Sequence, residues 1–400
     1  ADFLVGLLEQ LKESHHRAEQ AASSFGARAV LAGILPGYRL EHFPKERFVS
    51  NRYRNLDAGI KALTGRQSFD VHLEGPEGVA FCAPYILVEA INTSFQLHLS
   101  VAPDRFVRTY NVVQAISGIA LAPAVNSPVV FGRECWAESR IPIWEQATRP
   151  EQVPFGDSWI TSPLDPLFDL RRYDAILIDP EVIEAAPTAA EEHLDDLAKR
   201  TLALQNGIVW RWNRLCFGDD HLRIESRFLP AGPTPIDMVA NAAFFYGLIL
   251  GVSLELSNRF GASSIEDLLP FEVAKRNFRQ AAQFGPAAQL QWIDSSGKLE
   301  RYPARTLCLM LLPLADRGLE SVGVPAKQRE EFLGIVRDRL IHKQSGAEWI
   351  VARLRQLRGE RHPSPEQALA LELHKYQSEK NSAFRGSARP VHLWGRNSGD

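Results

Sequence analysis

The chain has 400 residues, 45% of them hydrophobic, and a formal net charge of -3 at pH 7. This composition predicts a folded protein with a sizeable core, and it excludes a general polyanion-binding surface. The four cysteines contain no CxxC pair, which favours a reduced, cytoplasmic protein over a disulfide framework or a zinc site.

No targeting or membrane-spanning segment is visible in the sequence. The N-terminus lacks the pattern of a secretory signal peptide. The longest apolar run, residues 242–252, is shorter than the roughly 20 residues that span a bilayer, so it predicts a buried core helix. We therefore expect cytoplasmic localisation and no membrane or nucleic-acid partner, while the subunit number, a homo-oligomer included, stays open.

Hydrophobic periodicity divides the chain into a strand-containing part and a helical part. A helix is predicted over 1–25, and short strands are predicted at 30–34, 68–74 and 93–101. The further predicted elements, in chain order, are a helix at 105–123, a loop from 126, an irregular segment at 150–180, a helix at 191–204, strands from 208, and helices at 236–256, 271–284, 304–319, 326–341, 346–358 and 364–379. The fold class is therefore α+β, as one domain over 1–380 (strand-rich to 235, helical from 236) with a tail over 381–400.

Two predicted strands each carry a polar face. Gln96 and His98 alternate with apolar residues, and Arg223, Glu225 and Arg227 alternate with residues that are apolar except for Ser226. Such alternation is also normal for an antiparallel sheet with one solvated side, and His98 by itself is compatible with a structural role. Glutamate and neutral histidine suit a divalent cation, and arginine matches phosphate or carboxylate. The face is therefore a candidate site for an anionic substrate, a nucleotide and magnesium.

Two further stretches carry candidate binding residues. In residues 126–144 we expect Ser139 and Arg140 on an exposed loop, where arginine can reach an anion, although a plain solvated loop fits equally. Residues 208–218 are predicted to pair with 222–228 as a hairpin. Alternation places four residues of this stretch on one side of the strand, namely Trp210, Trp212, Arg214 and Cys216. The pattern leaves open whether that side faces the site or the core.

Five motifs in order give the chain a resemblance to a known family. They are TSFQLHL (93–99), AVNSPVVFG (124–132), ESRIPIW (138–144), WNRLCF (212–217) and RIESRFLP (223–230). Together they resemble the second type of the glutamate–cysteine ligase family, which includes carboxylate–amine ligases, over about residues 20–358. The resemblance implies a glutamine synthetase-like fold, in which the concave polar face of a curved antiparallel sheet holds ATP, Mg²⁺ and glutamate.

The resemblance also implies a reaction and residue roles. ATP would phosphorylate a carboxylate such as the γ-carboxylate of glutamate, and an amine such as cysteine would attack the acyl phosphate to give a γ-glutamyl amide, as in glutathione biosynthesis. The implied roles are Glu225 and His98 as metal ligands, Arg227 and Arg140 as catalytic residues, Gln96, Ser139, Arg140 and Arg214 as substrate-binding residues, and Arg214 and Arg227 as ATP-binding residues.

The sequence departs from the family pattern at its start. The family opens with a strand carrying Glu-x-Glu, which supplies further magnesium ligands, and this sequence contains no such strand, so we expect the first strands to be lacking. Two alternatives to a ligase follow. One is a catalytically inactive relative that binds a nucleotide or amino acid and regulates a partner. The other is an interaction protein that uses the basic, amphipathic stretch over 353–361.

Overall fold

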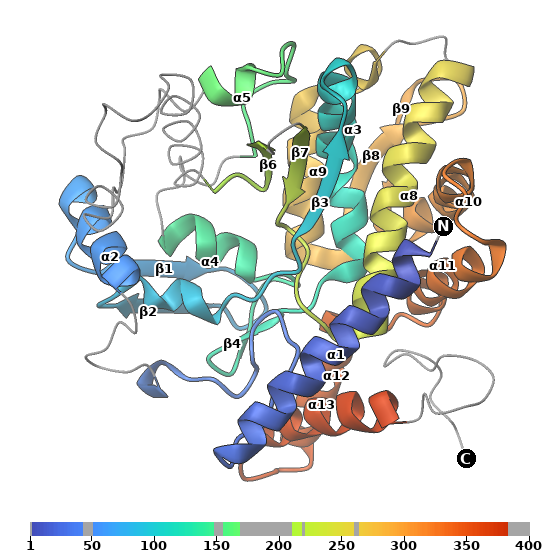
Figure 1. Ribbon diagram of the computed structural model, residues 1–400. Helices are drawn as coiled ribbons and strands as arrows, with labels where there is room; N and C mark the ends of the chain where they lie inside the picture. Colours follow the sequence, from blue (N-terminus) through green and yellow to red (C-terminus); the bar gives the residue numbers. More distant parts are fainter. Residues whose placement is uncertain are drawn as a thin grey trace, which may run out of the picture.

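The computed structural model describes residues 2–42, 51–147, 155–168, 210–217, 221–259 and 264–382 (Figure 1). The helix expected over 191–204 and the tail lie outside these residues. The helices are α1 Phe3–Ser24, α2 Asn51–Thr64, α3 Phe106–Leu121, α4 Arg140–Ala147, α5 Asp165–Phe168, α8 Pro235–Arg259, α9 Phe271–Phe284, α10 Ala304–Ser321, α11 Ala326–Ile341, α12 Gly346–Gly359 and α13 Pro365–Ser382.

The strands form four small sheets, and every pair of strands described is antiparallel. They are β1 Phe69–Leu73, β2 Val79–Ala83, β3 Leu97–Val101, β4 Val129–Val130, β5 Arg133–Glu134, β6 Asn213–Phe217, β7 Leu222–Ser226, β8 Gln289–Ile293 and β9 Leu299–Pro303. One sheet has three strands in the order β3-β7-β6, and the others are the two-stranded pairs β1-β2, β4-β5 and β8-β9. The mixture of helices with antiparallel strands agrees with the expected α+β class.

Helix α3 supports the three-stranded sheet from behind (Figure 1). All its residues from 110 to 121 are buried, polar ones included. The Tyr110 hydroxyl donates to the carbonyl of Asn213 on β6 at 2.8 Å, and the Asn213 amide donates to Gln114 at 2.6 Å and Ser117 at 2.9 Å. These bonds satisfy the buried polar groups under the sheet, so its other face is left for solvent or a ligand.

Helix α8 is the central helix of the core and packs closely on α10. Gly247 on α8 allows this approach, because a Cβ atom there would lie 2.6 Å from the carbonyl oxygen of Ala315. Among the described residues, one helix, over Pro235–Asn258, is long and apolar enough to cross a membrane, and 72% of its window is buried inside the protein. The prediction of a buried helix at 242–252 is confirmed.

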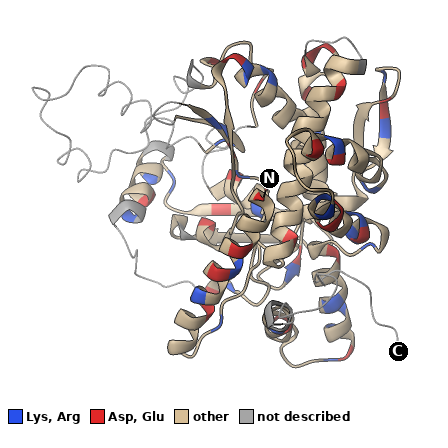
Figure 2. Cartoon of the chain, turned by 45° about the vertical axis from the view of Figure 1, so that its right-hand side comes forward, with Lys and Arg blue, Asp and Glu red and all other residues tan. Residues whose placement is uncertain are grey.

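Several elements differ from the expectation. Residues 30–34 form no strand. The helix α2 and the hairpin β8-β9 were not predicted, and the hairpin places two strands inside the part expected to be helical. Charged residues of both signs are interspersed along exposed helices such as α1 (Figure 2), where Lys12 pairs with Glu9 and Arg17 with Glu13.

Candidate active site

Three candidate residues lie in one row across the sheet β3-β7-β6. His98 on β3 and Arg214 on β6 both pair with Glu225 on the central strand β7. Two residues further along β6, and so on the same face of the sheet, Cys216 pairs with Arg223. Since side chains alternate along a strand, all five side chains belong to the face opposite α3. The hairpin expected from 208–218 and 222–228 is confirmed by the pairing of β6 with β7.

The carboxylate of Glu225 lies at the centre of this row. Its side chain is only 5% exposed, Arg214 Nη2 donates to its Oε2 at 2.9 Å, and Arg227 Nε lies 3.2 Å from its Oε1. Burial by itself would raise the pKa of Glu225, but Arg214 and Arg227 outweigh it, so the pKa is lowered. Glu225 is therefore a carboxylate at neutral pH, held by two guanidinium groups.

A pocket of about 330 Å³ opens beside this row. Its walls include Leu56, Trp144, Trp210 and Trp212, and its polar lining includes Glu89, Asn92, Gln96, Arg140 and Arg227. The parity question at β6 is thereby answered, because Trp210 and Trp212 face the pocket while Arg214 and Cys216 face Glu225. A concave site with aromatic walls and a few convergent polar groups is typical of a small-molecule site.

Two buried polar side chains in the pocket carry atoms that make no hydrogen bond within the described part of the chain. The guanidinium of Arg227 lies 5.6 Å from the ring centre of Trp144, and its Nη1 makes no hydrogen bond. Both amide atoms of Asn92 are also buried without a partner. Burial, and then the charge of Arg214, lower the pKa of Arg227 to about 10, so it stays protonated at pH 7. An unsatisfied buried donor costs about 1–3 kcal/mol, which an acceptor on a ligand would recover.

Ser139 and Arg140 do not lie on an exposed loop, and that prediction was wrong. Both are buried where α4 begins. Arg140 Nε donates to Glu138 at 2.7 Å and its Nη2 donates to the carbonyl of Phe228 at 2.6 Å. The Ser139 hydroxyl donates to the carbonyl of Trp136 at 2.9 Å. Arg140 reaches the pocket lining, whereas Ser139 is absent from it.

Glu138 fixes Arg140 in this position. Its fully buried carboxylate accepts hydrogen bonds from the backbone of Asn126 and the hydroxyl of Ser127, both at 2.8 Å, as well as from Arg140. Since a buried guanidinium requires a counter-charge, the NSP segment and the ESR segment form one support for the pocket wall. Sequence reasoning assigned no role to Glu138.

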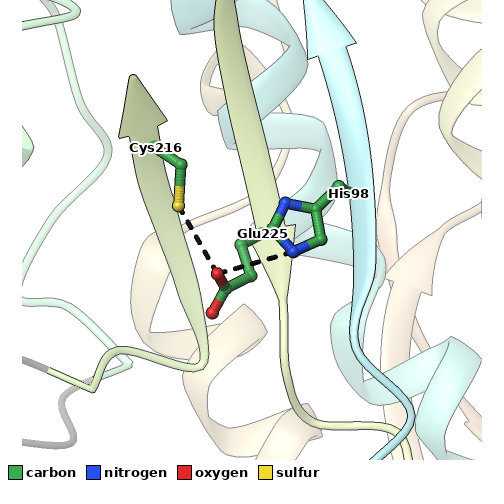
Figure 3. A group of neighbouring side chains, drawn as sticks. All are labelled: His98, Cys216 and Glu225. Atoms are coloured by element: carbon green, nitrogen blue, oxygen red, sulfur yellow. Dashed lines mark hydrogen bonds and ion pairs between the residues drawn. The ribbon is translucent and has the colours of Figure 1, made fainter. Parts of the chain in front are cut away.

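His98, Cys216 and Glu225 form a group of metal-ligand atoms on the sheet (Figure 3). The His98 Nε2, the Cys216 Sγ and a Glu225 oxygen all lie within 4.8 Å of one another. Burial, and then the nearby arginines, lower the pKa of His98 against the opposing effect of Glu225. The imidazole is therefore neutral at pH 7, the form that binds metal ions.

The profile of glutamate-cysteine ligase family 2 matches residues 4–370, most of the chain. The chain belongs to glutamate-cysteine ligase family 2. No curated protein sequence matches it significantly.

The motif segments of this family 2 member converge at the site. Residues 93–99 supply Gln96 and His98, residues 138–144 supply Arg140 and Trp144, and the hairpin supplies the remaining charged residues. Residues 124–132 contribute through Asn126 and Ser127, which hold Glu138.

The pocket residues of the family 2 member that were missed from the sequence include Leu56, Glu89 and Asn92. Leu56 lies on α2, and Glu89 and Asn92 lie in or just after the 3₁₀ segment Ile86–Ile91. None of the three stands in a strand with a polar face, so alternation gave no signal. Their relation to the site depends on tertiary packing.

Proposed function

We propose that this family 2 member is an ATP-dependent carboxylate–amine ligase that forms a γ-glutamyl amide, or a similar amide, through an acyl phosphate. The observation that carries the proposal is the unpartnered, buried Nη1 of Arg227 beside the carboxylate of Glu225. Phosphoryl transfer depends on positioning and on neutralising charge at the phosphoryl oxygens, and guanidinium groups in a confined pocket supply both.

The arginines divide the binding work between phosphate and carboxylate. Arg227 and Arg214 flank Glu225 on the sheet, where they would bind the phosphates of the nucleotide. Arg140, fixed by Glu138, would bind a carboxylate of the substrate from the opposite wall, with Gln96 at the rim of the pocket. The amide of Asn92 can both donate to and accept from an amino-acid substrate. Ser139 would act indirectly, by keeping the start of α4 in place.

Glu225 fits a bound Mg²⁺, whereas the imidazole of His98, 3.6 Å from the Oε2 of Glu225, is a softer ligand than this ion prefers. Magnesium in nucleotide sites commonly takes one or two carboxylates and completes its shell with phosphate and water. Glu225 supplies such a carboxylate, and its buried Oε1, which makes no hydrogen bond with any described residue, lies 3.2 Å from Arg227 Nε. When bound, the ion would neutralise charge on the phosphates. The polar face of β3-β7-β6 also supports the finer proposal that this sheet is part of a glutamine synthetase-like curved sheet.

The proposal is tested by ADP release from ATP and Mg²⁺ with a panel of amino acids as substrates. We expect amino-acid-dependent release, and we expect Glu225→Gln to abolish it, because one metal-binding charge is lost with little change of volume. Circular dichroism checks that the variant is folded, since Arg214 and Arg227 lose their buried partner. The matched control is Glu134→Gln, which also removes a buried, arginine-paired carboxylate but lies on β5, outside the pocket. Unchanged turnover in Glu225→Gln would show that its assigned role is wrong.

A second candidate is a catalytically silent relative that binds a nucleotide or amino acid and regulates a partner. It is favoured by the single carboxylate, Glu225, among the described residues on the face of β3-β7-β6. Calorimetry separates the two candidates. Binding of ATP without turnover on any tested amino acid would support the silent relative, and amino-acid-dependent ADP release would exclude it.

A further inference from the structure

The ligase proposal leaves one member of the sheet's donor group unused. Cys216 lies on β6, and its Sγ approaches Glu225 Oε2 at 3.5 Å (Figure 3). His98, from β3 on the other side of Glu225, places its Nε2 at 3.6 Å from the same oxygen. A thiol, an imidazole and a carboxylate from three hydrogen-bonded strands therefore converge on one point, on a rigid framework.

Two of the three spacings between the donor atoms match those around a tetrahedral ion. Zinc binds sulfur at about 2.3 Å and nitrogen or oxygen at about 2.0–2.2 Å, which puts neighbouring tetrahedral ligands roughly 3.3–3.6 Å apart. The Sγ–Oε2 and Nε2–Oε2 distances of 3.5 and 3.6 Å lie in this range, and no pair in the group exceeds 4.8 Å. Small side-chain movements would thus enclose an ion and leave a fourth position open.

The surroundings give access to the group and leave Glu225 able to ligate. The side chain of His98 is 40% exposed, so one side of the group meets solvent. Each oxygen of Glu225 meets an arginine, because Arg214 Nη2 donates to Oε2 at 2.9 Å and Arg227 Nε lies 3.2 Å from Oε1. An ion can therefore take Oε2 if Arg214 moves aside, or Oε1 if Arg227 does. The two guanidinium groups oppose a cation. When the ion displaces the Cys216 thiol proton to solvent, the resulting thiolate adds one negative charge and offsets part of that opposition.

We propose that His98, Cys216 and Glu225 form a site for a thiophilic divalent cation such as Zn²⁺. Thiolate and imidazole select zinc-like ions, whereas Mg²⁺ prefers oxygen ligands alone, so Cys216 gives the sheet a selectivity that a magnesium site does not need. Zinc binding stands independently of ligase activity. Where the chain also acts as a ligase, zinc occupies Glu225 and excludes Mg²⁺ from it, so zinc inhibits turnover.

The test is a titration of the reduced, untagged 400-residue chain with Co²⁺, a spectroscopic substitute for zinc. We expect one equivalent of Co²⁺ to give a thiolate-to-cobalt charge-transfer band that Zn²⁺ then displaces. Cys216→Ser should abolish the band and weaken Co²⁺ binding by more than about 100-fold, above the 10–100-fold that loss of a supporting hydrogen bond costs. His98→Gln should retain a weaker band. The control is Cys82→Ser, which removes an exposed cysteine on β2 and should leave the band unchanged.

Two results would overturn the site. One is the absence of the band in the unaltered chain at saturating Co²⁺. The other is a band that survives in Cys216→Ser, or that disappears in Cys82→Ser, while circular dichroism shows that each variant is folded. Because neither ATP nor turnover enters the titration, its failure is distinguishable from failure of the ligase proposal, which the ADP assay reads.

Discussion

The ion pair between Arg339 on α11 and Asp237 on α8 gives the sharpest stability prediction. Both side chains are almost wholly buried, with exposures of 2% and 0%, and Arg339 Nη2 lies 3.0 Å from Asp237 Oδ1. The other terminal nitrogen donates to Asn241 at 2.7 Å and to the carbonyl of Pro123 at 2.9 Å. This carbonyl belongs to the segment that leads into Asn126, so the pair also supports the pocket wall.

Replacing Arg339 with methionine keeps most of the hydrocarbon stem and removes the charge. Asp237 then keeps the hydroxyl of Thr234, at 2.6 Å, as its side-chain partner among the described residues. Removing one partner of a buried pair costs about 3–5 kcal/mol, because the remaining charge is left uncompensated. We therefore expect Arg339→Met to lower the free energy of unfolding by about that amount. The double variant Asp237→Asn/Arg339→Met removes the orphan charge and should recover part of the loss.

Arg353→Met is the matched control. Arg353 binds both oxygens of Glu372 at 2.7 Å, so its contacts are shorter than those of the buried pair. Its side chain and that of Glu372 are 25% and 29% exposed, and pairs in contact with water contribute about 0–1 kcal/mol. Urea unfolding followed by circular dichroism measures both variants. Equal losses in Arg339→Met and Arg353→Met would refute the reasoning that burial, more than contact distance, sets the energy.

Three further predictions concern the site, the core and pH. Arg227→Lys should lower amino-acid-dependent ADP release by about 100–1,000-fold, because an ammonium group cannot reproduce the two-pronged contact with phosphate, and near-normal kinetics would contradict the assigned role. Gly247→Ala should destabilise the fold by about 1–3 kcal/mol in urea unfolding, since its Cβ would lie 2.6 Å from the carbonyl oxygen of Ala315. Burial lowers the pKa of His15, so the unfolded chain takes up its proton more readily and stability falls as pH drops below about 6.5. His15→Gln should flatten this dependence in urea midpoints measured across that range, and an unchanged slope would argue against it.

Helix positions were predictable where the hydrophobic pattern is local and strong. The expected bounds 271–284 and 326–341 coincide with α9 and α11, because one apolar face repeats along each helix. The hairpin β8-β9 was missed although its turn, Asp294-Ser-Ser-Gly297, is a normal turn signal, and its strands are short. The apolar character of the flanking helices dominated the pattern there.

The polar faces of the hairpin β6-β7 and of β3 could be predicted from the alternation of polar and apolar residues. The register in which these strands pair could not. Alternation shows that His98, Arg214 and Glu225 each belong to a polar face, and only the strand order β3-β7-β6 shows that they meet. The same limit applies to the zinc site proposed above. Cysteine spacing detects ligands that lie close together in the sequence, whereas His98 comes from a strand far from Cys216 along the chain.

The burial of Arg140 shows most clearly why a local pattern misjudges such a site. Arginine is seldom fully buried unless it is paired, so a segment with a glutamate and an arginine two residues apart is typical of an exposed loop. Here the pairing partner is Glu138 itself, and the remaining bond goes to the carbonyl of Phe228, from a distant part of the chain. The sequence pattern thus predicts an exposed Arg140, whereas in the fold a distant segment covers it. The hydrogen bonds to Glu138 and Phe228 hold the Arg140 side chain in the pocket lining. Because the partner at Phe228 is a backbone carbonyl, which every residue has, the residue type at this position does not indicate the hydrogen bond.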